Sequence, residues 1–270
     1  MQRERSPSHQ TLRDFVDALQ AEGRYTFDRA EAMAVLKVSS PVLKKAMTRL
    51  VAKRRIAVPT RGFFVIVPLE YRAAGAPPAS WFIDDLMRHL GKPYYVGVLS
   101  AAGLHGAAHQ QPQEFQVVTA VSRRSAVAGR SRIRFFGKRH VEHTPTAVLK
   151  SETGTMRVST PEATAIDLLR YLSSAGGLGN VATVLAELAE RIDPALLAQA
   201  AADDGEFACA QRLGYILDAV DSGDRAEELA KLVANADPRR IPLVPGLPTR
   251  GCPVDRRWHL ILNERVEADL

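Results

Sequence analysis

The sequence predicts an α+β fold in which an N-terminal winged helix-turn-helix is followed by a larger mixed α/β C-terminal domain. Residues 9–69 show helical and then strand-like apolar spacing, and residues 73–79 are small residues and prolines. The rest of the chain mixes short apolar runs with Ala- and Leu-rich helical patterns. A length of 270 residues suits two domains. We expect them to cover residues 1–75 and 76–270, joined by a linker at 73–79.

The N-terminal module begins with a predicted helix over residues 11–23. Thr11 can cap this helix and Gly23 can end it. Its predicted buried side is Leu12, Phe15, Val16 and Leu19. Asp28 can cap a second helix, which ends in a short turn at Lys37. The predicted buried side of this second helix is Ala32, Val35 and Leu36.

A third helix is predicted to begin at Pro41 with Ser40 as its cap, because a serine followed by proline is typical of a helix start. Its predicted buried side is Val42, Leu43, Ala46, Met47 and Leu50. Two apolar runs follow at residues 56–58 and 63–67, and the segment between them has the residues of a turn. These runs predict a hairpin that completes the module.

The second domain alternates shorter elements. Thr160 followed by Pro161 predicts the start of a helix, and residues 178–234 predict three or four more. Strands are predicted at residues 115–121, 132–136, 148–149, 156–158 and 256–263, and a further helix at 81–90. The segment 238–254 contains five prolines and is expected to run over the surface.

Composition excludes several classes of protein. Apolar residues make up 46% and charged residues 24%, which is ordinary for a globular protein. No apolar run reaches the length of a membrane span, and the polar N-terminus lacks the apolar stretch of a secretion signal. Cys209 and Cys252 form neither a metal-spaced pair nor a disulfide framework. We therefore expect a cytoplasmic protein.

Charge is unevenly distributed along the chain. Residues 1–75 contain 14 Lys and Arg against 7 Asp and Glu, and residues 181–237 contain 4 against 12. No acidic residue occurs from residue 32 to residue 69, where eight basic residues occur. These are Lys37, Lys44, Lys45, Arg49, Lys53, Arg54, Arg55 and Arg61. Such a module repels itself unless a polyanion neutralises it, which favours nucleic acid as its partner.

The position of the third helix indicates which residues would contact DNA. In a helix-turn-helix the start of the second helix of the motif enters the major groove. The residues expected to face bases or phosphates are Ser39, Ser40, Lys44, Lys45 and Thr48. Those expected to contact phosphates are Arg49, Lys53, Arg54, Arg55 and Arg61. The alternative is a module of the same shape that contacts protein, with solvated lysines.

A second basic stretch without acidic residues runs from residue 115 to residue 141. Its central part is expected to form a loose loop between two strands. The possible second nucleic-acid contacts in this stretch are Arg123, Arg124, Arg130, Arg132 and Arg134. An exposed hairpin without any partner is an equal alternative.

No pattern in the chain predicts catalysis, so we expect no enzyme, no metal and no cofactor. His105 and His109 have the spacing of a zinc pair, but the glutamate that would serve as a base is missing. The glycine-rich stretch 176–180 does not follow a strand and is expected to be a turn between helices. Asp167 lies within an apolar helix and is expected to pair with an arginine.

Four segments after the predicted winged helix resemble, in their order, the AbiEi antitoxins of type IV toxin–antitoxin (abortive infection) systems. They are YYVGVLSAAGLHGAAHQQPQEFQVVT at 94–119, SRIRFF at 131–136, VSTPEATAIDLL at 158–169 and WHLILNERVEAD at 258–269. The resemblance implies a phage-defence regulator that binds repeats in its own promoter as double-stranded DNA and represses its operon. It also implies that residues 76–270 counter a nucleotidyltransferase-like toxin without forming a stable complex with it.

Other functions remain open at the level of the sequence. The chain could be a transcriptional regulator without a toxin partner, since the family contains such members. It could be a nuclease or nucleotidyltransferase whose basic front holds the substrate, although clustered carboxylates are not evident. It could also be an adaptor whose acidic segment 181–237 binds a basic partner.

Overall fold

The computed structural model describes residues 11–107 and 113–267, which form two compact units. Unit 1 contains the described residues of 1–93 together with 123–135 and 149–156. Unit 2 contains the described residues of 94–122, 136–148 and 157–270. The predicted domains are contiguous in sequence, whereas the units are interleaved. The interleaving arises from two hairpins in the middle of the chain. Their tips, residues 123–135 and 149–156, belong to unit 1, whereas the residues before and after these tips belong to unit 2.

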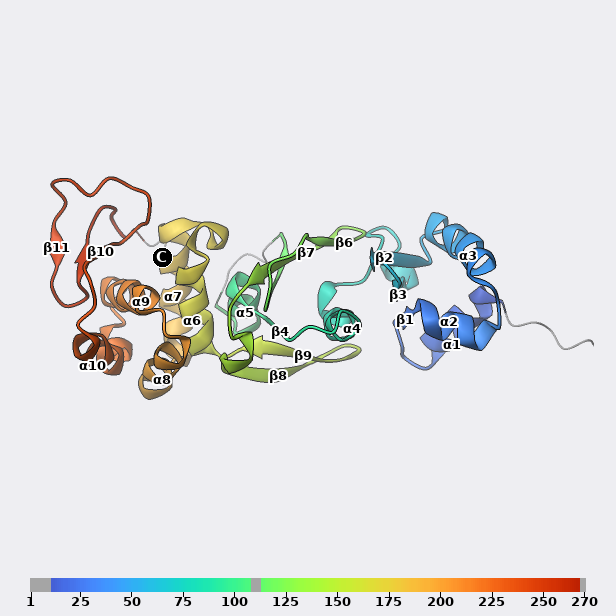
Figure 1. The fold of residues 1–270 in the computed structure, drawn as a ribbon, viewed down its shortest axis with the longest axis horizontal. Coiled ribbons are helices and arrows are strands. Elements are labelled where there is room, and N and C mark those ends of the chain that lie inside the picture. Colours follow the sequence, from blue (N-terminus) through green and yellow to red (C-terminus); the bar gives the residue numbers. More distant parts are fainter. Residues whose placement is uncertain (1–10, 108–112, 268–270) are drawn as a thin grey trace, which may run out of the picture. The chain divides into compact units, whose positions relative to one another are not determined.

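Unit 1 begins with three helices and a small antiparallel sheet (Figure 1). The helices are α1 (Leu12–Ala21), α2 (Arg29–Leu36) and α3 (Ser40–Ala52). The strands are β1 (Thr26–Asp28), β2 (Ile56–Thr60) and β3 (Phe63–Ile66), in the order β1-β3-β2. Each predicted helix and strand of this module is present within a few residues of its expected bounds. The sheet and the three helices enclose one apolar core.

Local signals in the sequence set the helix starts of this module. The Thr11 hydroxyl accepts a hydrogen bond from the Asp14 N–H, and the Asp14 carboxylate accepts one from the Thr11 N–H at 3.0 Å. Asp28 caps α2 by accepting from the Glu31 N–H at 2.8 Å. Helix α3 begins one residue earlier than predicted, so Ser39 and not Ser40 is at the cap position, and Ser39 makes no side-chain cap. Thr11 and Asp28 therefore cap their helices as predicted.

Two predicted core positions of this module are wrong. Val35 is 46% exposed and Val42 is 55% exposed. In α3 the buried line is Leu43, Met47 and Leu50, and Val42 lies about 100° around the helix from Leu43. In α2 only Ala32 is buried, because the helix turns Met33 and Leu36 toward the core instead of Val35. Apolar spacing alone therefore does not distinguish the buried face of α2 or α3 from the exposed apolar position next to it.

The segment predicted as a linker, residues 73–79, is a packed part of unit 1. Ala76 and Ala79 are buried, and short 3₁₀ helices lie at Leu69–Tyr71 and Ala79–Trp81. The ring of Trp81 contacts the rings of Tyr25 and Tyr71, with centroid distances of 5.1 Å and 5.2 Å. Helix α4 (Ile83–His89) follows. The aromatic contacts explain why this proline- and alanine-rich stretch does not behave as an exposed linker.

Strands β6 (Ala126–Ala128) and β7 (Ser131–Gly137) pair as an antiparallel hairpin. The loose loop predicted for this stretch is therefore wrong. The turn lies against the backbone of residues 74–76, and the Arg130 N–H donates to the Ala74 carbonyl at 2.8 Å. Gly129 has a φ of +55°, and a Cβ there would lie 2.2 Å from the Ala74 oxygen. Only glycine permits this close approach, which fixes the hairpin tip within unit 1.

A six-stranded sheet has the order β6-β7-β5-β4-β9-β8. Its other strands are β4 (Tyr94–Val96), β5 (Phe115–Thr119), β8 (Thr146–Ser151) and β9 (Gly154–Ser159). Strand β4 pairs antiparallel with β5 and parallel with β9. Helix α5 (Val98–Leu104) follows β4, and α6 (Pro161–Arg170) follows β9. The Thr160 hydroxyl caps α6, as predicted.

The remainder of unit 2 is mostly helical (Figure 1). The helices are α7 (Gly177–Leu188), α8 (Pro194–Asp204), α9 (Phe207–Ala219) and α10 (Glu227–Ala236). The 3₁₀ helices of this unit are Val141–His143, Leu172–Ala175, Ala189–Arg191 and Gly223–Ala226. A small sheet of β10 (Ile241–Pro242), β12 (Leu260–Ile261) and β11 (Val254–Asp255) follows. The apolar sides of these helices share one core with β4, β5 and the C-terminal Trp258.

Three predictions for unit 2 need correction. The glycine-rich stretch is not only a turn, because α7 begins at Gly177. The predicted last strand is confined to Leu260–Ile261, and the residues before it form a turn. The proline-rich segment does not lie wholly on the surface, because Leu243 is fully buried and β10 pairs with β12.

Among the described residues, no helix is both long and apolar enough to cross a membrane.

Candidate nucleic-acid interface and charged pocket

Helix α3 exposes a basic face opposite its buried line. Lys44, Lys45, Thr48 and Arg49 are all exposed, and we call these four residues the basic face of α3. The Thr48 hydroxyl donates to the Lys44 carbonyl at 3.0 Å, and the Arg49 Nε donates to the Lys45 carbonyl at 3.4 Å. These bonds stay within the helix, so both ammonium groups and most of the guanidinium are left to solvent.

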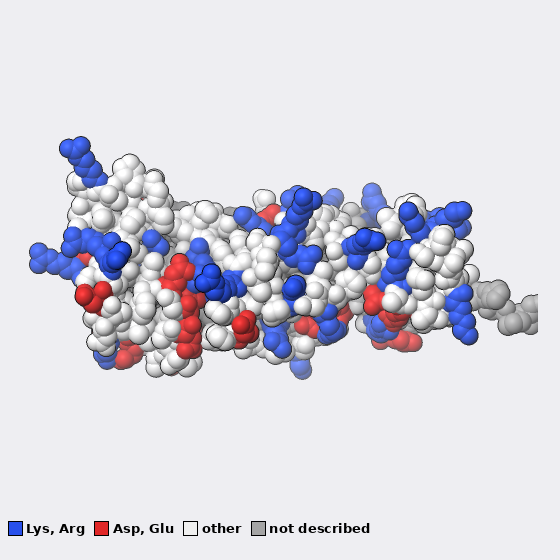
Figure 2. Space-filling model, in the orientation of Figure 1, with Lys and Arg blue, Asp and Glu red and all other residues white. Residues whose placement is uncertain are grey.

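The other predicted contact residues lie on either side of α3. Ser39 and Ser40 are exposed at the start of the helix, and the Ser40 hydroxyl accepts a hydrogen bond from Arg29 at 3.0 Å. Lys53 and Arg54 are exposed directly after the helix. Arg61 is exposed in the turn between β2 and β3. On the face drawn in Figure 2, several Lys and Arg side chains lie in the region of α3, and acidic side chains lie nearer to β1.

Arg55 differs from the other predicted phosphate contacts. Its side chain is only 16% exposed, and its guanidinium forms an ion pair with Asp17 of α1. The same group lies 3.5 Å from the Gln20 side-chain oxygen. This guanidinium therefore ties the end of α3 to α1, and it is already neutralised by a carboxylate within the module.

The hairpin of β6 and β7 carries the second basic group, which we call the arginine hairpin. Its members are Arg123, Arg124, Arg130, Arg132 and Arg134. On β7, the exposed Arg132 and Arg134 alternate with the buried Ile133 and Phe135. The Arg123 guanidinium lies 5.2 Å from the centroid of the Phe135 ring. These five arginines belong to unit 1, the same unit as the basic face of α3.

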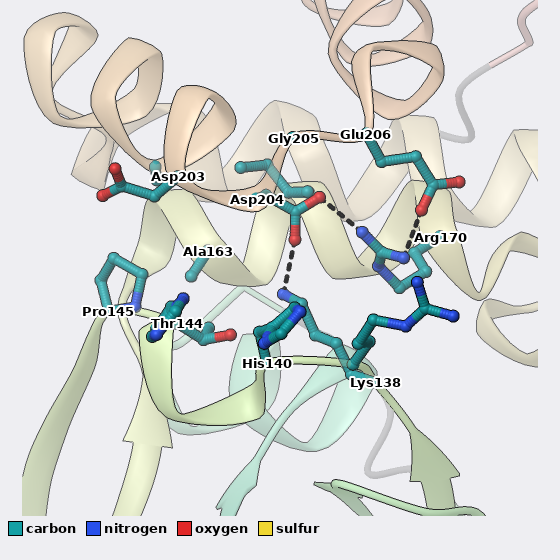
Figure 3. A pocket seen from close by; sticks show the side chains of 14 residues that line it. Lys138, His140, Thr144, Pro145, Ala163, Arg170, Asp203, Asp204, Gly205 and Glu206 are labelled. Carbon is teal, nitrogen blue, oxygen red and sulfur yellow. Dashed lines mark hydrogen bonds and ion pairs between the residues drawn. The ribbon is translucent and has the colours of Figure 1, made fainter.

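Unit 2 contains a charged pocket of about 250 Å³ (Figure 3). The Lys138 Nζ lies 2.7 Å from an Asp204 carboxylate oxygen, and Arg170 pairs with both Asp204 and Glu206. The lining residues are Lys138, Arg139, His140, His143, Thr144, Pro145, Ala163, Ile166, Arg170, Ala200, Asp203, Asp204, Gly205 and Glu206. Cations and carboxylates in this pocket pair with one another. These ion pairs link the end of β7 and helix α6 to the segment where α8 ends and α9 begins.

Beneath the pocket lies a fully buried carboxylate, Asp167. The Tyr95 hydroxyl donates to it at 2.8 Å, and the Lys138 Nζ lies 3.3 Å from it. Burial raises the pKa of Asp167 above its ordinary value, although Lys138 and Tyr95 act in the opposite direction. Burial likewise raises the pKa of Tyr95 well above its ordinary value. The predicted arginine partner of Asp167 is wrong, because the cation in contact with it is Lys138.

Two of the segments that carry the family resemblance, 94–119 and 158–169, meet in unit 2. The His105 ring lies 2.7 Å from the Ser159 carbonyl, which gives this histidine a structural partner. The Gln116 N–H donates to the Ser100 hydroxyl at 2.9 Å. The Glu162 carboxylate accepts from the Asp193 N–H at 3.1 Å. Lys138 and Asp204 could not be recognised as partners from the sequence, because they are separated by 66 positions and share no periodic pattern.

Of the two histidines with the spacing of a zinc pair, His109 lies outside the described residues. Within residues 11–107 and 113–267, no group of three or more His, Cys, Asp or Glu side chains is arranged to hold a metal ion.

The fold is that of a mixed α/β protein. In unit 2, buried ion pairs connect Lys138 to Asp167 and Asp204. Residues 95–219 match the family model described as the AbiEi antitoxin C-terminal domain. The chain therefore carries an AbiEi-type antitoxin domain, which confirms the resemblance predicted from the sequence. Tyr95, Lys138, Asp167 and Asp204 all lie within the matched segment.

One solved structure supports the fold of nearly the whole chain. The RV2827C protein from Mycobacterium tuberculosis has a crystal structure similar to this one, with a TM-score of 0.67. The similarity covers 98% of this chain and 93% of that chain at 15% sequence identity, so it concerns the fold alone. The comparison with curated proteins finds no match.

Proposed function

We propose that this antitoxin is also a DNA-binding repressor of its own type IV toxin–antitoxin operon. The observation that carries the proposal is the basic face of α3, which lies in a stretch of 38 residues, from 32 to 69, without an acidic residue. A surface of one sign is favourable when a phosphate backbone neutralises it. The family match supports the antitoxin role and, in general, a toxin partner.

The element order of unit 1 fits a winged helix-turn-helix. Helices α2 and α3 are separated by only three residues, Lys37 to Ser39, and β2 and β3 follow α3 as a hairpin. In this arrangement α3 is the recognition helix and the β2–β3 hairpin is the wing. Lys44, Lys45 and Thr48 would contact the major groove, and Ser39 and Ser40 would lie at the helix entry.

The phosphate contacts are assigned by exposure and existing partners. Arg49, Lys53, Arg54 and Arg61 are exposed and are proposed to contact the backbone of the duplex. Arg55 is assigned to the fold of unit 1 instead, because Asp17 already neutralises it. Six to eight neutralised phosphates would make the affinity fall with salt at a log–log slope of about −5 to −7.

The arginine hairpin is proposed as a second nucleic-acid contact. The backbone contact between its turn and Ala74 holds it in the same unit as the recognition helix. Strand β6 also lies beside β2 of the proposed wing. Arginines on a hairpin next to the wing are suited to phosphates that flank the operator, a contact that adds affinity without reading sequence.

For the second domain, 76–270, we propose an antitoxin activity that is not enzymatic and acts in the cytoplasm. It would counter a nucleotidyltransferase-like toxin without a stable complex. A toxin-producing strain tests this part: expression of the antitoxin should restore growth, and purified toxin and antitoxin should elute separately from a sizing column. Failure to restore growth would leave a regulator without a toxin partner.

The repressor part is tested by a gel shift with the DNA upstream of the gene. The double variant Lys44→Glu with Lys45→Glu should abolish the shift. The matched control is Arg239→Glu with Arg240→Glu, which makes the same change in charge at two adjacent exposed residues of unit 2. Unchanged binding by a folded Lys44→Glu, Lys45→Glu protein would refute the assignment of α3.

A further inference from the structure

Val42 is an exposed apolar side chain at the start of the proposed recognition helix. It is 55% exposed, more than Val51 at 41% on the same helix. Two positions earlier, Ser40 begins α3, so Val42 lies in its first turn. Side chains in the first turns of a recognition helix are those that reach base edges in the major groove.

The neighbours of Val42 on the helix surface are cationic. Residues three and seven positions further on share its flank, and these are Lys45 and Arg49 of the basic face. No acidic side chain follows on the helix. A duplex whose phosphates contact Arg49 and whose major groove contacts Lys45 would therefore bring that groove onto the Val42 methyl groups.

We propose that Val42 recognises thymine by packing against its 5-methyl group in the major groove. This inference rests on the proposed function. A valine side chain can neither donate nor accept a hydrogen bond, so it cannot read the polar edges of guanine, adenine or cytosine. Among the four bases only thymine presents an apolar group in the major groove. The operator half-site should accordingly contain a thymine opposite the start of α3.

The test removes single methyl groups from the DNA. In the promoter fragment, each thymine is replaced in turn by deoxyuridine, which pairs as thymine does but lacks the 5-methyl group. Binding is measured by fluorescence anisotropy with the full-length protein. One deoxyuridine per half-site should weaken binding by about fourfold, the effect of about one buried CH₂ equivalent.

Two variants assign this effect to a side chain. Val42→Ala should bind the unmodified promoter about fourfold more weakly and should lose its sensitivity to that deoxyuridine. Val51→Ala, the same substitution on the same helix, should keep the wild-type pattern. Both changes favour the helix, because alanine has the higher helix propensity.

The outcomes separate the two proposals. If the wild-type protein binds the promoter but no deoxyuridine weakens it, the thymine contact is refuted and the repressor assignment stands. If Val42→Ala shows the same sensitivity as the wild type, another side chain reads the methyl group and the inference is overturned. If the wild-type protein does not bind the promoter, the proposed function itself fails.

Discussion

Gly214 of α9 lies against the indole ring of Trp258. A Cβ at position 214 would be 2.1 Å from two atoms of the ring, Cζ3 and Cη2. Trp258 is fully buried, and its Nε1 donates to the Asp218 carboxylate at 2.6 Å. Residues 214 and 218 are one helical turn apart, so the tail segment is fixed to α9 by a steric fit and by a hydrogen bond.

Gly214→Ala should destabilise the protein. In an unobstructed helix this substitution stabilises by about 1 kcal/mol. Here the new methyl group would overlap the indole ring, and overpacking in a core costs about 1–3 kcal/mol. Urea unfolding followed by tryptophan fluorescence measures the change, and increased stability would contradict the predicted fit.

A second substitution checks that the ring is the cause. Trp258→Phe removes the outer part of the indole, so Gly214→Ala should cost less in the Trp258→Phe background than in the wild type. Equal costs in the two backgrounds would show that the methyl group meets something other than the ring.

The fit between Gly214 and Trp258 could not be predicted from the sequence. The two residues are 44 positions apart, and neither has a periodic partner that indicates the contact. The caps at Thr11 and Asp28 could be predicted, because a cap depends on residues within one helical turn. The exposure of Val42 was only partly predictable. Apolar spacing identifies the buried side of a helix, but only to within about one residue.

Arg49 and Arg55 should behave differently when truncated. Arg55→Ala removes an ion pair with Asp17 in which the arginine side chain is 16% exposed, so the free energy of unfolding should fall by about 1 kcal/mol. Arg49→Ala removes an exposed cation and should leave stability within about 0.5 kcal/mol. Thermal unfolding of the two variants gives this comparison.

The same two variants separate folding from DNA binding. If Arg49 makes the phosphate contact proposed above, Arg49→Ala should lower the magnitude of the salt slope of promoter binding by about 1. Arg55→Ala should leave that slope unchanged. A reduced slope in Arg55→Ala would mean that its guanidinium leaves Asp17 to contact DNA.

The charged pocket shows a further limit of sequence reasoning. Asp167 was recognisable as an acidic residue in an apolar helix, which indicates a buried and paired carboxylate. Its partner was predicted to be an arginine, yet Lys138 reaches it from the end of β7. Which cation approaches a helix depends on strand pairing and crossover, and neither is encoded within a few residues of Asp167.

Asp167→Asn should change how stability depends on pH. Burial raises the pKa of Asp167 in the folded protein. A carboxyl with a raised folded pKa stabilises the fold below its unfolded pKa, and this contribution is lost as pH rises through the folded pKa. Between the ordinary pKa of 3.8 and the raised one, the wild type should therefore lose stability relative to Asp167→Asn as pH rises.

Urea unfolding over a pH series measures this difference, at about 1.4 kcal/mol for each unit by which the two pKa values differ. Asp224→Asn is a suitable control, because the Asp224 side chain is 72% exposed. A wild type that gains stability over Asp167→Asn in this window would show that Lys138 and Tyr95 outweigh burial.

The two cysteines should differ sharply in reactivity. Cys209 is 1% exposed, and burial raises the pKa of its thiol to about 12. At pH 8 only about one in 10⁴ such groups is ionised, and the thiolate is the reactive form. Cys252 is partly exposed. A disulfide reagent at pH 8 should therefore label one thiol quickly, and Cys252→Ser should remove that phase. Labelling of Cys209 should wait for unfolding and follow its rate, whereas fast labelling of Cys252→Ser would mean that the core around α9 opens in the native state.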